Sequence, residues 1–311
     1  MRIALGLGIS LALFLGGTMA RAGGPPGADA HSASVTVTLL PNHSGEYPAV
    51  NPDDLRVCVN NQDRPVTSWI AADAEGPLDL VVMIDDSIKS NVALQYRDLA
   101  DFFPTLPAGT RVRIAYAAYG SERVAQYFTT DYERAVKALR LPIGPSLAGG
   151  SIYQSVGELL KKWPKDGHRH AVLLISDGID IYWDREYSDP LLNPDLQHDI
   201  DAAQSAGVTF YSIFVRGTQG LEGNFRLFDN GQSCLVRLTS ETGGQAYFQE
   251  TLSPLSFTPF LRHIGDALRH QYVLTYQPLA AQSSGYQKLR VTTANPGVHL
   301  VAPARVFIPK A

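Results

Sequence analysis

The chain has 311 residues, a formal net charge of −4 at pH 7 and a hydrophobic fraction of 45%. This charge balance gives no basic excess for phosphate binding and argues against nucleic acid as a main partner. Its two cysteines are too few for a disulfide scaffold or a four-cysteine zinc site. The composition therefore indicates a globular protein of one large domain or two smaller ones.

The first 22 residues have the features of a secretory signal peptide of the Sec type. Arg2 supplies a positive end, Ile3 to Phe14 form an apolar run, and Ala20-Arg21-Ala22 is a small-x-small cleavage site. The apolar run is shorter than the roughly twenty residues that span a bilayer, and no lipid-accepting cysteine follows it. We expect residues 1–22 to be removed and the mature chain, which has no apolar stretch long enough for a transmembrane span, to be secreted or periplasmic. An uncleaved N-terminal anchor is the alternative.

The pairing of Cys58 with Cys234 is left open by the sequence. Export favours a disulfide, which would close a long loop and contribute a few kcal/mol. Two buried free thiols, packed as small apolar groups, are the alternative. Geometry decides between the two.

Hydrophobic periodicity divides the chain after the signal into four parts. Residues 23–32 are a Gly-, Pro- and Ala-rich linker, and residues 33–75 alternate as half-buried strands do. Residues 76–270 alternate apolar strands with helical stripes, and residues 271–311 return to strands. The pattern predicts an α/β fold with a three-layer, doubly wound, mostly parallel sheet and small β additions from both termini.

The elements of this prediction follow from the sequence. The expected strands are Ser34–Leu39, Leu55–Val59, Val66–Ile70, Leu78–Ile84, Arg111–Tyr119, Arg123–Phe128, His170–Ser176, Val208–Val215, Gln245–Gln249, Gln271–Tyr276, Lys288–Thr292 and Val298–Ile308. The expected helices are Val92–Phe103, Asp131–Arg140, Ile152–Trp163, Asn193–Gly207, Cys234–Thr242 and Pro259–Arg269.

Polar side chains gather where two buried strands end and where one helix begins. Asp85 to Ser90 follow the first buried strand, Asp177 to Asp180 follow another, and Ala148 to Ser151 precede a helix. In an open α/β sheet, ligands bind outside the carboxyl ends of the strands. Carboxylate and hydroxyl oxygens are ligands that suit Mg²⁺, Mn²⁺ or Ca²⁺.

These three segments together resemble the von Willebrand factor type A (VWA) domain. Asp85-x-Ser87, Gly149-Gly150-Ser151 and Ile175-Ser-Asp177-Gly178 carry the resemblance, which covers roughly Gly76 to Arg269. The flanks Pro65–Trp69 and Gln271–Pro278 resemble the bacterial exported proteins termed VWFA-related, which extends the resemblance to nearly the whole mature chain.

The resemblance implies a metal-ion-dependent adhesion site (MIDAS). Its metal ligands would be Asp85, Ser87, Asp177 and Ser151, the last in place of a threonine. The metal would be Mg²⁺, Mn²⁺ or Ca²⁺. An acidic side chain of a protein partner would complete its coordination.

One residue departs from the D-x-S-x-S motif of such sites. Its third position, a hydroxyl in the family, is Lys89 here. An ammonium within about 4 Å of a divalent ion repels it. Either Lys89 turns outward, or its ammonium replaces the metal and pairs with Asp85 and Asp177. A further alternative is that Asp85, Ser87 and Asp177 only cap strand ends and bond loop amides.

A long acidic and aromatic segment follows Asp180. Tyr182, Trp183 and Tyr187 are expected either to anchor a partner or to fold back as an apolar plug. The preferred function is a secreted or periplasmic VWA-type binding or adhesion module with a degenerate metal site and no enzyme activity. Its partner would be an unidentified protein.

Two other functions remain open. One is a structural component of the cell envelope with an inactive metal site. The other is an exported hydrolase whose metals are held by Asp85, Asp177, Asp180 and Asp184. No histidine or nucleophile in these loops supports the hydrolase.

Overall fold

A computed structural model describes the chain from residue 32 to residue 308 with interruptions. The described residues are 32–42, 47–144, 150–164, 166–215, 224–248, 256–278 and 284–308. The predicted signal peptide, nearly all of the linker and Gly149 lie outside them. Among the helices of these ranges, none combines the length and apolar character needed to cross a membrane.

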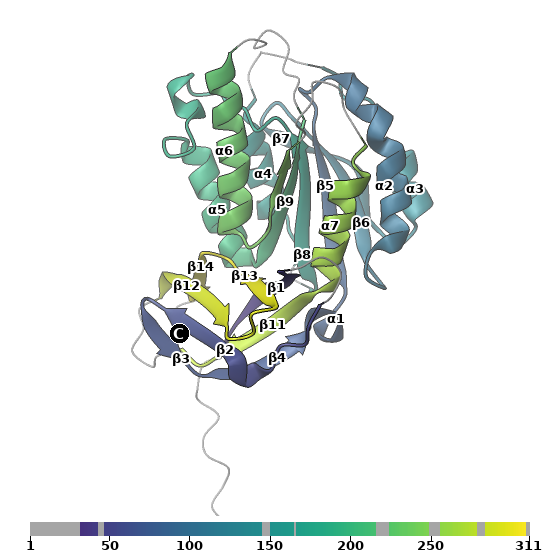
Figure 1. The fold of residues 1–311 in the computed structure, drawn as a ribbon. Helices are drawn as coiled ribbons and strands as arrows, with labels where there is room; N and C mark the ends of the chain where they lie inside the picture. Colours follow the sequence, from purple (N-terminus) through teal and green to yellow (C-terminus); the bar gives the residue numbers. More distant parts are fainter. Residues whose placement is uncertain are drawn as a thin grey trace, which may run out of the picture. The chain divides into compact units, whose positions relative to one another are not determined.

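A six-stranded, mostly parallel sheet lies at the centre of the α/β part (Figure 1). Its order is β10-β9-β8-β5-β6-β7, and every neighbouring pair is parallel except β6 with β7. The sheet confirms the predicted α/β class. The strands are β5 (Leu78–Asp85), β6 (Arg111–Ala118), β7 (Ser121–Thr129), β8 (Arg169–Ser176), β9 (Val208–Phe214) and β10 (Ala246–Phe248).

Helices cover both faces of this sheet because successive residues of a buried strand point to opposite sides. In β5, Leu80 and Val82 belong to a core shared with α2, α3 and α7, whereas Val81 belongs to a core shared with α4, α5 and α6. The helices are α1 (Ala72–Glu75), α2 (Tyr96–Phe102), α3 (Tyr132–Lys137), α4 (Ile152–Lys161), α5 (Pro194–Ala206), α6 (Phe225–Glu241) and α7 (Thr258–Arg269). Short 3₁₀ turns cover Pro52–Asp54, Ser90–Gln95, Phe103–Thr105 and Glu186–Ser188.

The strands from the two ends of the sequence pair with each other. They form two four-stranded sheets, β13-β1-β11-β4 and β14-β12-β2-β3, which share one apolar core that includes Val37, Val57 and Leu274. The predicted β additions are therefore two sheets with a core of their own. Their strands are β1 (Ala33–Pro41), β2 (Leu55–Val59), β3 (Gln62–Arg64), β4 (Val66–Ala71), β11 (Gln271–Tyr276), β12 (Gly285–Thr293), β13 (Val298–Val301) and β14 (Arg305–Ile308).

Several element boundaries differ from the prediction: for example, the expected helix Val92–Phe103 is a 3₁₀ turn followed by α2, and the expected helix Asp131–Arg140 ends at Lys137. The expected strand Val298–Ile308 is two strands in different sheets, separated by a segment that contains Pro303, which has no N–H to donate to a ladder. Helix α6 begins at Phe225, nine residues before the predicted start. Asn224 caps it by accepting a hydrogen bond of 3.2 Å from the N–H of Leu227.

Both cysteines are free thiols. Cys58 lies on β2 and is half-buried, and Cys234 is buried in α6. In the structure, Cys58 and Cys234 therefore do not form a disulfide.

Candidate functional site

Asp85 lies at the carboxyl end of β5, and its side chain is buried. Its Oδ1 accepts hydrogen bonds from the N–H (2.9 Å) and the hydroxyl (2.6 Å) of Ser87, and its Oδ2 accepts one of 2.6 Å from the hydroxyl of Ser176. Burial raises the pKa of Asp85, and the hydrogen bonds from Ser176 and Ser87 oppose that rise. Within the described residues, these donors to the carboxylate are neutral.

Ser151 begins helix α4 as its N-cap. Its hydroxyl accepts hydrogen bonds of 3.1 Å from the N–H groups of Tyr153 and Gln154 and donates one to the carboxylate of Asp180. Asp180 also accepts a hydrogen bond of 3.2 Å from the amide of Asn193, the N-cap of α5. Burial raises the pKa of Asp180. One acid thus connects the starts of two helices to the segment after β8.

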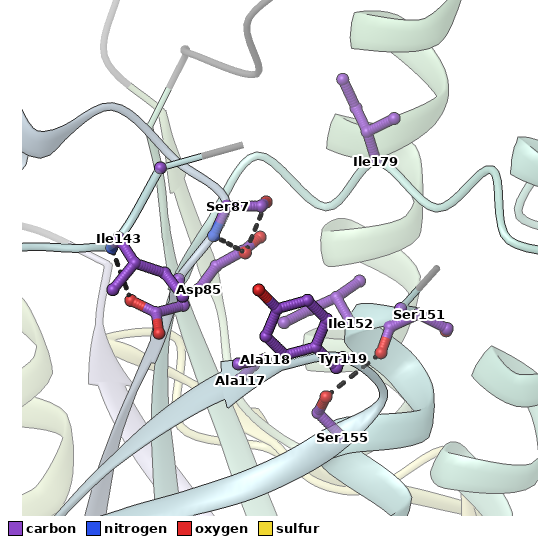
Figure 2. A pocket seen from close by; sticks show the side chains of 13 residues that line it. Asp85, Ser87, Ala117, Ala118, Tyr119, Ile143, Ser151, Ile152, Ser155 and Ile179 are labelled. Carbon is purple, nitrogen blue, oxygen red and sulfur yellow. Dashed lines mark hydrogen bonds between the residues drawn. The ribbon is translucent and has the colours of Figure 1, made fainter. Parts of the chain in front are cut away.

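Residues from the three predicted loops line one small cavity (Figure 2). Asp85 and Ser87 come from the segment after β5, Ser151 from the start of α4, and Ile179 from the segment after β8. The cavity has a volume of about 50 Å³, whereas one water-sized particle needs about 10–15 Å³. Three of the four predicted metal ligands therefore face a space that can hold an ion and water. Its other lining residues are Asp86, Ala117, Ala118, Tyr119, Ile143, Gly144, Gly150, Ile152 and Ser155.

Asp177, the fourth predicted ligand, is buried in the third loop and is not among the described residues that line the cavity. Its Oδ1 accepts a hydrogen bond of 3.0 Å from the N–H of Ile179, which does line it. Helix α6 packs closely on this loop, because a Cβ added at Gly231 would collide with the carbonyl oxygen of Asp177. The structure thus hydrogen-bonds Asp177 to a residue that lines the cavity, without placing Asp177 itself in the lining.

Lys89 is half-buried and directly precedes the 3₁₀ turn Ser90–Gln95. The described donors to Asp85 are the two serines rather than this lysine. The two alternatives for Lys89, an outward side chain or an ammonium that replaces the metal between Asp85 and Asp177, both stay predictions.

Asp86, the next residue after Asp85, has a positioning role. The guanidinium of Arg140 donates two hydrogen bonds of 2.8 Å to its two carboxylate oxygens, and the N–H of Ile143 donates one of 3.0 Å. Because Ile143 lines the cavity, this paired carboxylate fixes one of the cavity walls.

Large apolar and aromatic side chains are exposed near this edge of the sheet. Tyr119, Ile143, Tyr182, Trp183 and Tyr187 have exposed fractions between 42% and 62%. Tyr182 and Trp183 form an edge-to-face pair with ring centroids 5.2 Å apart. The three aromatic residues after Asp180 do not form a buried plug.

The contacts of Ser176 and Asp180 were not assigned from the sequence. The parallel register pairs Ile84 with Ile175, which sets the following residues, Asp85 and Ser176, side by side. The strand register could therefore have indicated the contact between Ser176 and Asp85. Asp180 lies on an irregular segment, where no periodicity indicates its contact with Ser151.

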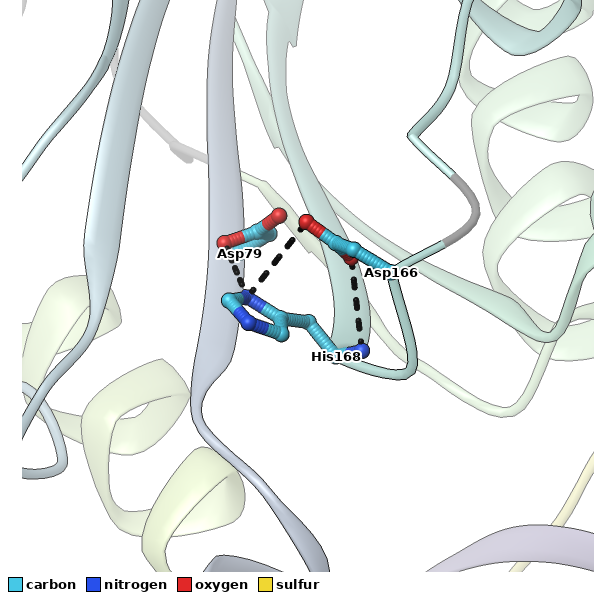
Figure 3. Close-up of side chains that lie close together, drawn as sticks. All are labelled: Asp79, Asp166 and His168. Atoms are coloured by element: carbon cyan, nitrogen blue, oxygen red, sulfur yellow. Dashed lines mark hydrogen bonds and ion pairs between the residues drawn. The ribbon is translucent and has the colours of Figure 1, made fainter.

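A second group of possible metal ligands lies at the opposite end of β5 (Figure 3). Asp79, Asp166 and His168 offer ligand atoms within 4.8 Å of one another. Arg111 already donates hydrogen bonds of 2.6–2.7 Å to both carboxylates, and His168 Nδ1 lies 3.0 Å from Asp79. The group is an ion-pair network whose acids are paired with an arginine.

No protein-family profile matches the chain, and no curated protein matches it. Similar solved structures include an aerotolerance-related membrane protein from Bacteroides fragilis (13% identity, 61% of this chain, 98% of that chain, TM-score 0.43). A second is the SpRpn10 VWA domain, with 13% identity over 61% of this chain and 96% of that chain and a TM-score of 0.42. A third is a von Willebrand factor type A protein from Catenulispora acidiphila, with 10% identity over 90% of this chain and 74% of that chain and a TM-score of 0.43. The chain is similar to VWA domains, as its sequence predicts.

Proposed function

We propose that this protein is an exported binding module of the VWA type, not an enzyme. It binds a protein partner at the carboxyl edge of the six-stranded sheet, through a degenerate MIDAS. Asp85, Ser87 and Ser151 would hold Mg²⁺, Mn²⁺ or Ca²⁺, with Asp177 contributing from the adjoining loop.

The observation that carries this proposal is the environment of Asp85. Its carboxylate is buried beside a cavity that Ser87 and Ser151 also line, and its described donors are neutral. A buried carboxylate is costly to ionise, and a divalent cation in the cavity would lower that cost. Mg²⁺ is held by few protein ligands and keeps several waters, which fits this set of one carboxylate and two hydroxyls.

A bound cation would supply a positive centre for an acidic side chain of the partner. The exposed side chains of Tyr119, Ile143 and Trp183 would add apolar contact area around it. Aromatic anchors around one charged contact are a common arrangement in protein interfaces.

Calorimetric titration with Mg²⁺, Mn²⁺ and Ca²⁺ tests the metal site. We expect one saturable site in the wild type and in the control Asp184→Asn, which changes an exposed acid, and no binding in Asp85→Asn. The variant Lys89→Ser should bind at least tenfold more tightly, because it restores a hydroxyl and removes a positive charge. Absence of binding in the wild type and in Lys89→Ser would exclude the metal site.

Partner binding is tested by recovery of proteins from cell-envelope extract with and without chelator. A partner that is lost with chelator, with Asp85→Asn and with Trp183→Ala supports the proposal. Recovery unchanged by all three treatments favours a structural component with an inactive site.

Export is tested by N-terminal sequencing. A secreted or periplasmic chain that begins at Gly23 supports export, and an intact cytoplasmic chain contradicts it.

A further inference from the structure

The outward face of the sheet β14-β12-β2-β3 carries several cations. Along β12, Leu289 and Val291 point into the core, so the alternating residues Lys288 and Arg290 point outward. The register places Arg305 opposite Lys288 and Cys58 opposite Arg290. Three basic side chains therefore lie side by side on this face.

These residues line a cavity of about 390 Å³, within the roughly 300–1,000 Å³ usual for small-molecule sites. Three cations, Lys288, Arg290 and Arg305, and one acid, Glu241, line it, which gives a local charge of 3 − 1 = +2. The whole chain has a net charge of −4. The cavity is thus a positive site on a protein that is negative overall.

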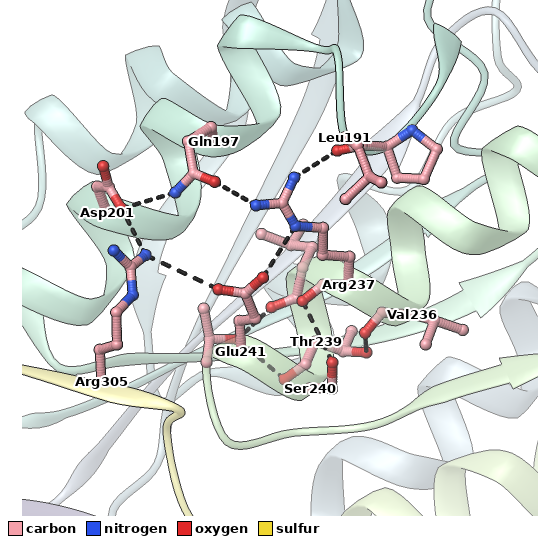
Figure 4. A network of polar contacts seen from close by, with 12 residues as sticks. Leu191, Gln197, Asp201, Val236, Arg237, Thr239, Ser240, Glu241 and Arg305 are labelled. Carbon is pink, nitrogen blue, oxygen red and sulfur yellow. Dashed lines mark hydrogen bonds and ion pairs between the residues drawn. The ribbon is translucent and has the colours of Figure 1, made fainter. Parts of the chain in front are cut away.

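The acid in this cavity is already paired (Figure 4). Glu241 accepts a hydrogen bond of 2.8 Å from Arg237 Nε and lies 3.8 Å from Arg305 Nη2. The same Nη2 donates a hydrogen bond of 2.6 Å to Asp201. These contacts fix the position of Arg305 and use one of its nitrogen atoms.

Lys288 and Arg290 differ from Arg305 in their pairing. Both are exposed, and within the described ranges no ion pair joins either side chain to an acid. Lys288 and Arg290 lie two residues apart on the same face of β12, so their charges repel each other. A multivalent oxyanion between them would remove that repulsion. Guanidinium groups present paired N–H donors that match the oxygens of such a group.

We propose that this cavity binds a small ligand that carries a phosphate or diphosphate group, held by Lys288, Arg290 and Arg305. Cys58, Asn61 and Ala304 also line the cavity and leave room for an uncharged part of the ligand. The site lies on the two-sheet β part and is independent of Asp85. Its failure would leave the proposed cation site unaffected.

Calorimetric titration with inorganic pyrophosphate in metal-free buffer tests the site. We expect one saturable site in the wild type and at least a tenfold weaker affinity in Lys288→Gln/Arg290→Gln. The control Lys161→Gln/Lys162→Gln removes the same charge from the last residue and the C-cap of α4, where both lysines pair with Glu158. This control should change the affinity less than twofold. Thermal unfolding confirms that both variants are folded.

Equal weakening in both double variants, or titration without saturation, would overturn the proposal. A lipid headgroup is the other source of the same chemistry, so sedimentation with phosphatidylglycerol vesicles is the second arm. A free ligand predicts pyrophosphate binding without vesicle binding. Vesicle binding without pyrophosphate binding would overturn the proposed ligand.

Discussion

The hydroxyl of Ser176 donates a hydrogen bond of 2.6 Å to Oδ2 of Asp85 across two neighbouring parallel strands. The hydroxyl oxygen of Ser176 in turn accepts a hydrogen bond of 2.9 Å from the N–H of Gly178. One side chain therefore connects the buried carboxylate after β5 to the loop after β8. The position of the segment after β5 relative to the loop after β8 therefore depends on the side chain of Ser176.

Replacing Ser176 by alanine should lower the free energy of unfolding by about 2 kcal/mol, because it removes a buried hydrogen bond to a carboxylate and leaves the N–H of Gly178 without its acceptor. Urea unfolding measures the change. The matched control is Ser205→Ala, an exposed serine of α5 whose hydroxyl donates to the carbonyl oxygen of Ala202 in its own helix, with an expected change below about 0.5 kcal/mol. Equal changes in the two variants would show that the contact with Asp85 does not stabilise the fold.

Gly231 controls how closely α6 approaches the loop of Asp177 and Gly178. A Cβ at this position would collide with the Asp177 carbonyl and lie 2.9 Å from a side-chain carbon of Ile179. We expect Gly231→Ala to lower the free energy of unfolding by about 1–3 kcal/mol through overpacking. The exposed Ser233→Ala on the same helix is the control. A stability of Gly231→Ala equal to that of the control in urea unfolding would contradict this packing.

Elements with strong periodicity were predictable from the sequence. The apolar run of β5 and the apolar stripe of α4 both come from burial patterns that depend on local sequence alone. The pairing of β1 with β11 was not predictable, because it sets Val35 against Leu274, far apart in the chain, and no local pattern records that choice. The start of α6 carries the buried residues Leu227 and Phe228, two turns before Cys234 and Leu235, but the polar segment 229–233 between them obscured this stripe in the sequence.

The candidate site shows the same division. The fold topology alone predicted that Asp85, Ser87 and Ser151 approach one another, because parallel strand ends and helix starts share one edge of the sheet. The contact of Ser151 with Asp180 depends on the path of an irregular segment. Such paths are set by individual hydrogen bonds rather than by residue pattern.

The two cysteines should differ in reactivity. Burial raises the pKa of Cys234 to about 12, and its thiol donates a hydrogen bond of 3.4 Å to the carbonyl oxygen of Ser188. Because the thiolate is the reactive form, Cys234 should react slowly with an aromatic disulfide reagent at pH 8. Cys58 is half-buried and should react first. The structure would be contradicted if both thiols reacted rapidly with the reagent, or if no thiol reacted until the protein had been reduced. The variant Cys58→Ser identifies which thiol reacts rapidly.

Asp86 depends on Arg140 for its charge compensation. The Asp86 side chain is 3% exposed, whereas that of Arg140 is 42% exposed, so solvent partly screens the pair. We expect Arg140→Met to cost about 2 kcal/mol of unfolding free energy, since it leaves a buried carboxylate without its cation. Adding Asp86→Asn to this variant should recover part of the loss, because it removes the uncompensated charge. A double-mutant cycle by urea unfolding measures the coupling, and strictly additive losses would contradict it.

Asp199 makes the stability of the protein depend on pH. It is buried on α5 facing α4, where a Cβ at Gly157 would lie 3.0 Å from its Oδ1. Burial raises its pKa well above 3.8, and the charges of Asp195 and Asp180 raise it further. The folded state therefore holds a proton that the unfolded chain releases above about pH 4.

This shift stabilises the fold fully below the unfolded pKa, and the stabilisation is lost as the pH rises through the raised folded pKa. Relative to Asp199→Asn, which cannot ionise, the wild type should lose about 1.4 kcal/mol of unfolding free energy per pH unit within that window. Urea unfolding from pH 4 to pH 8 measures the difference. Asp229→Asn, which changes an exposed acid of α6, should run parallel to the wild type. If Asp199→Asn also runs parallel to it, the carboxyl of Asp199 has the same proton affinity in both states, and its burial between α4 and α5 does not govern its ionisation.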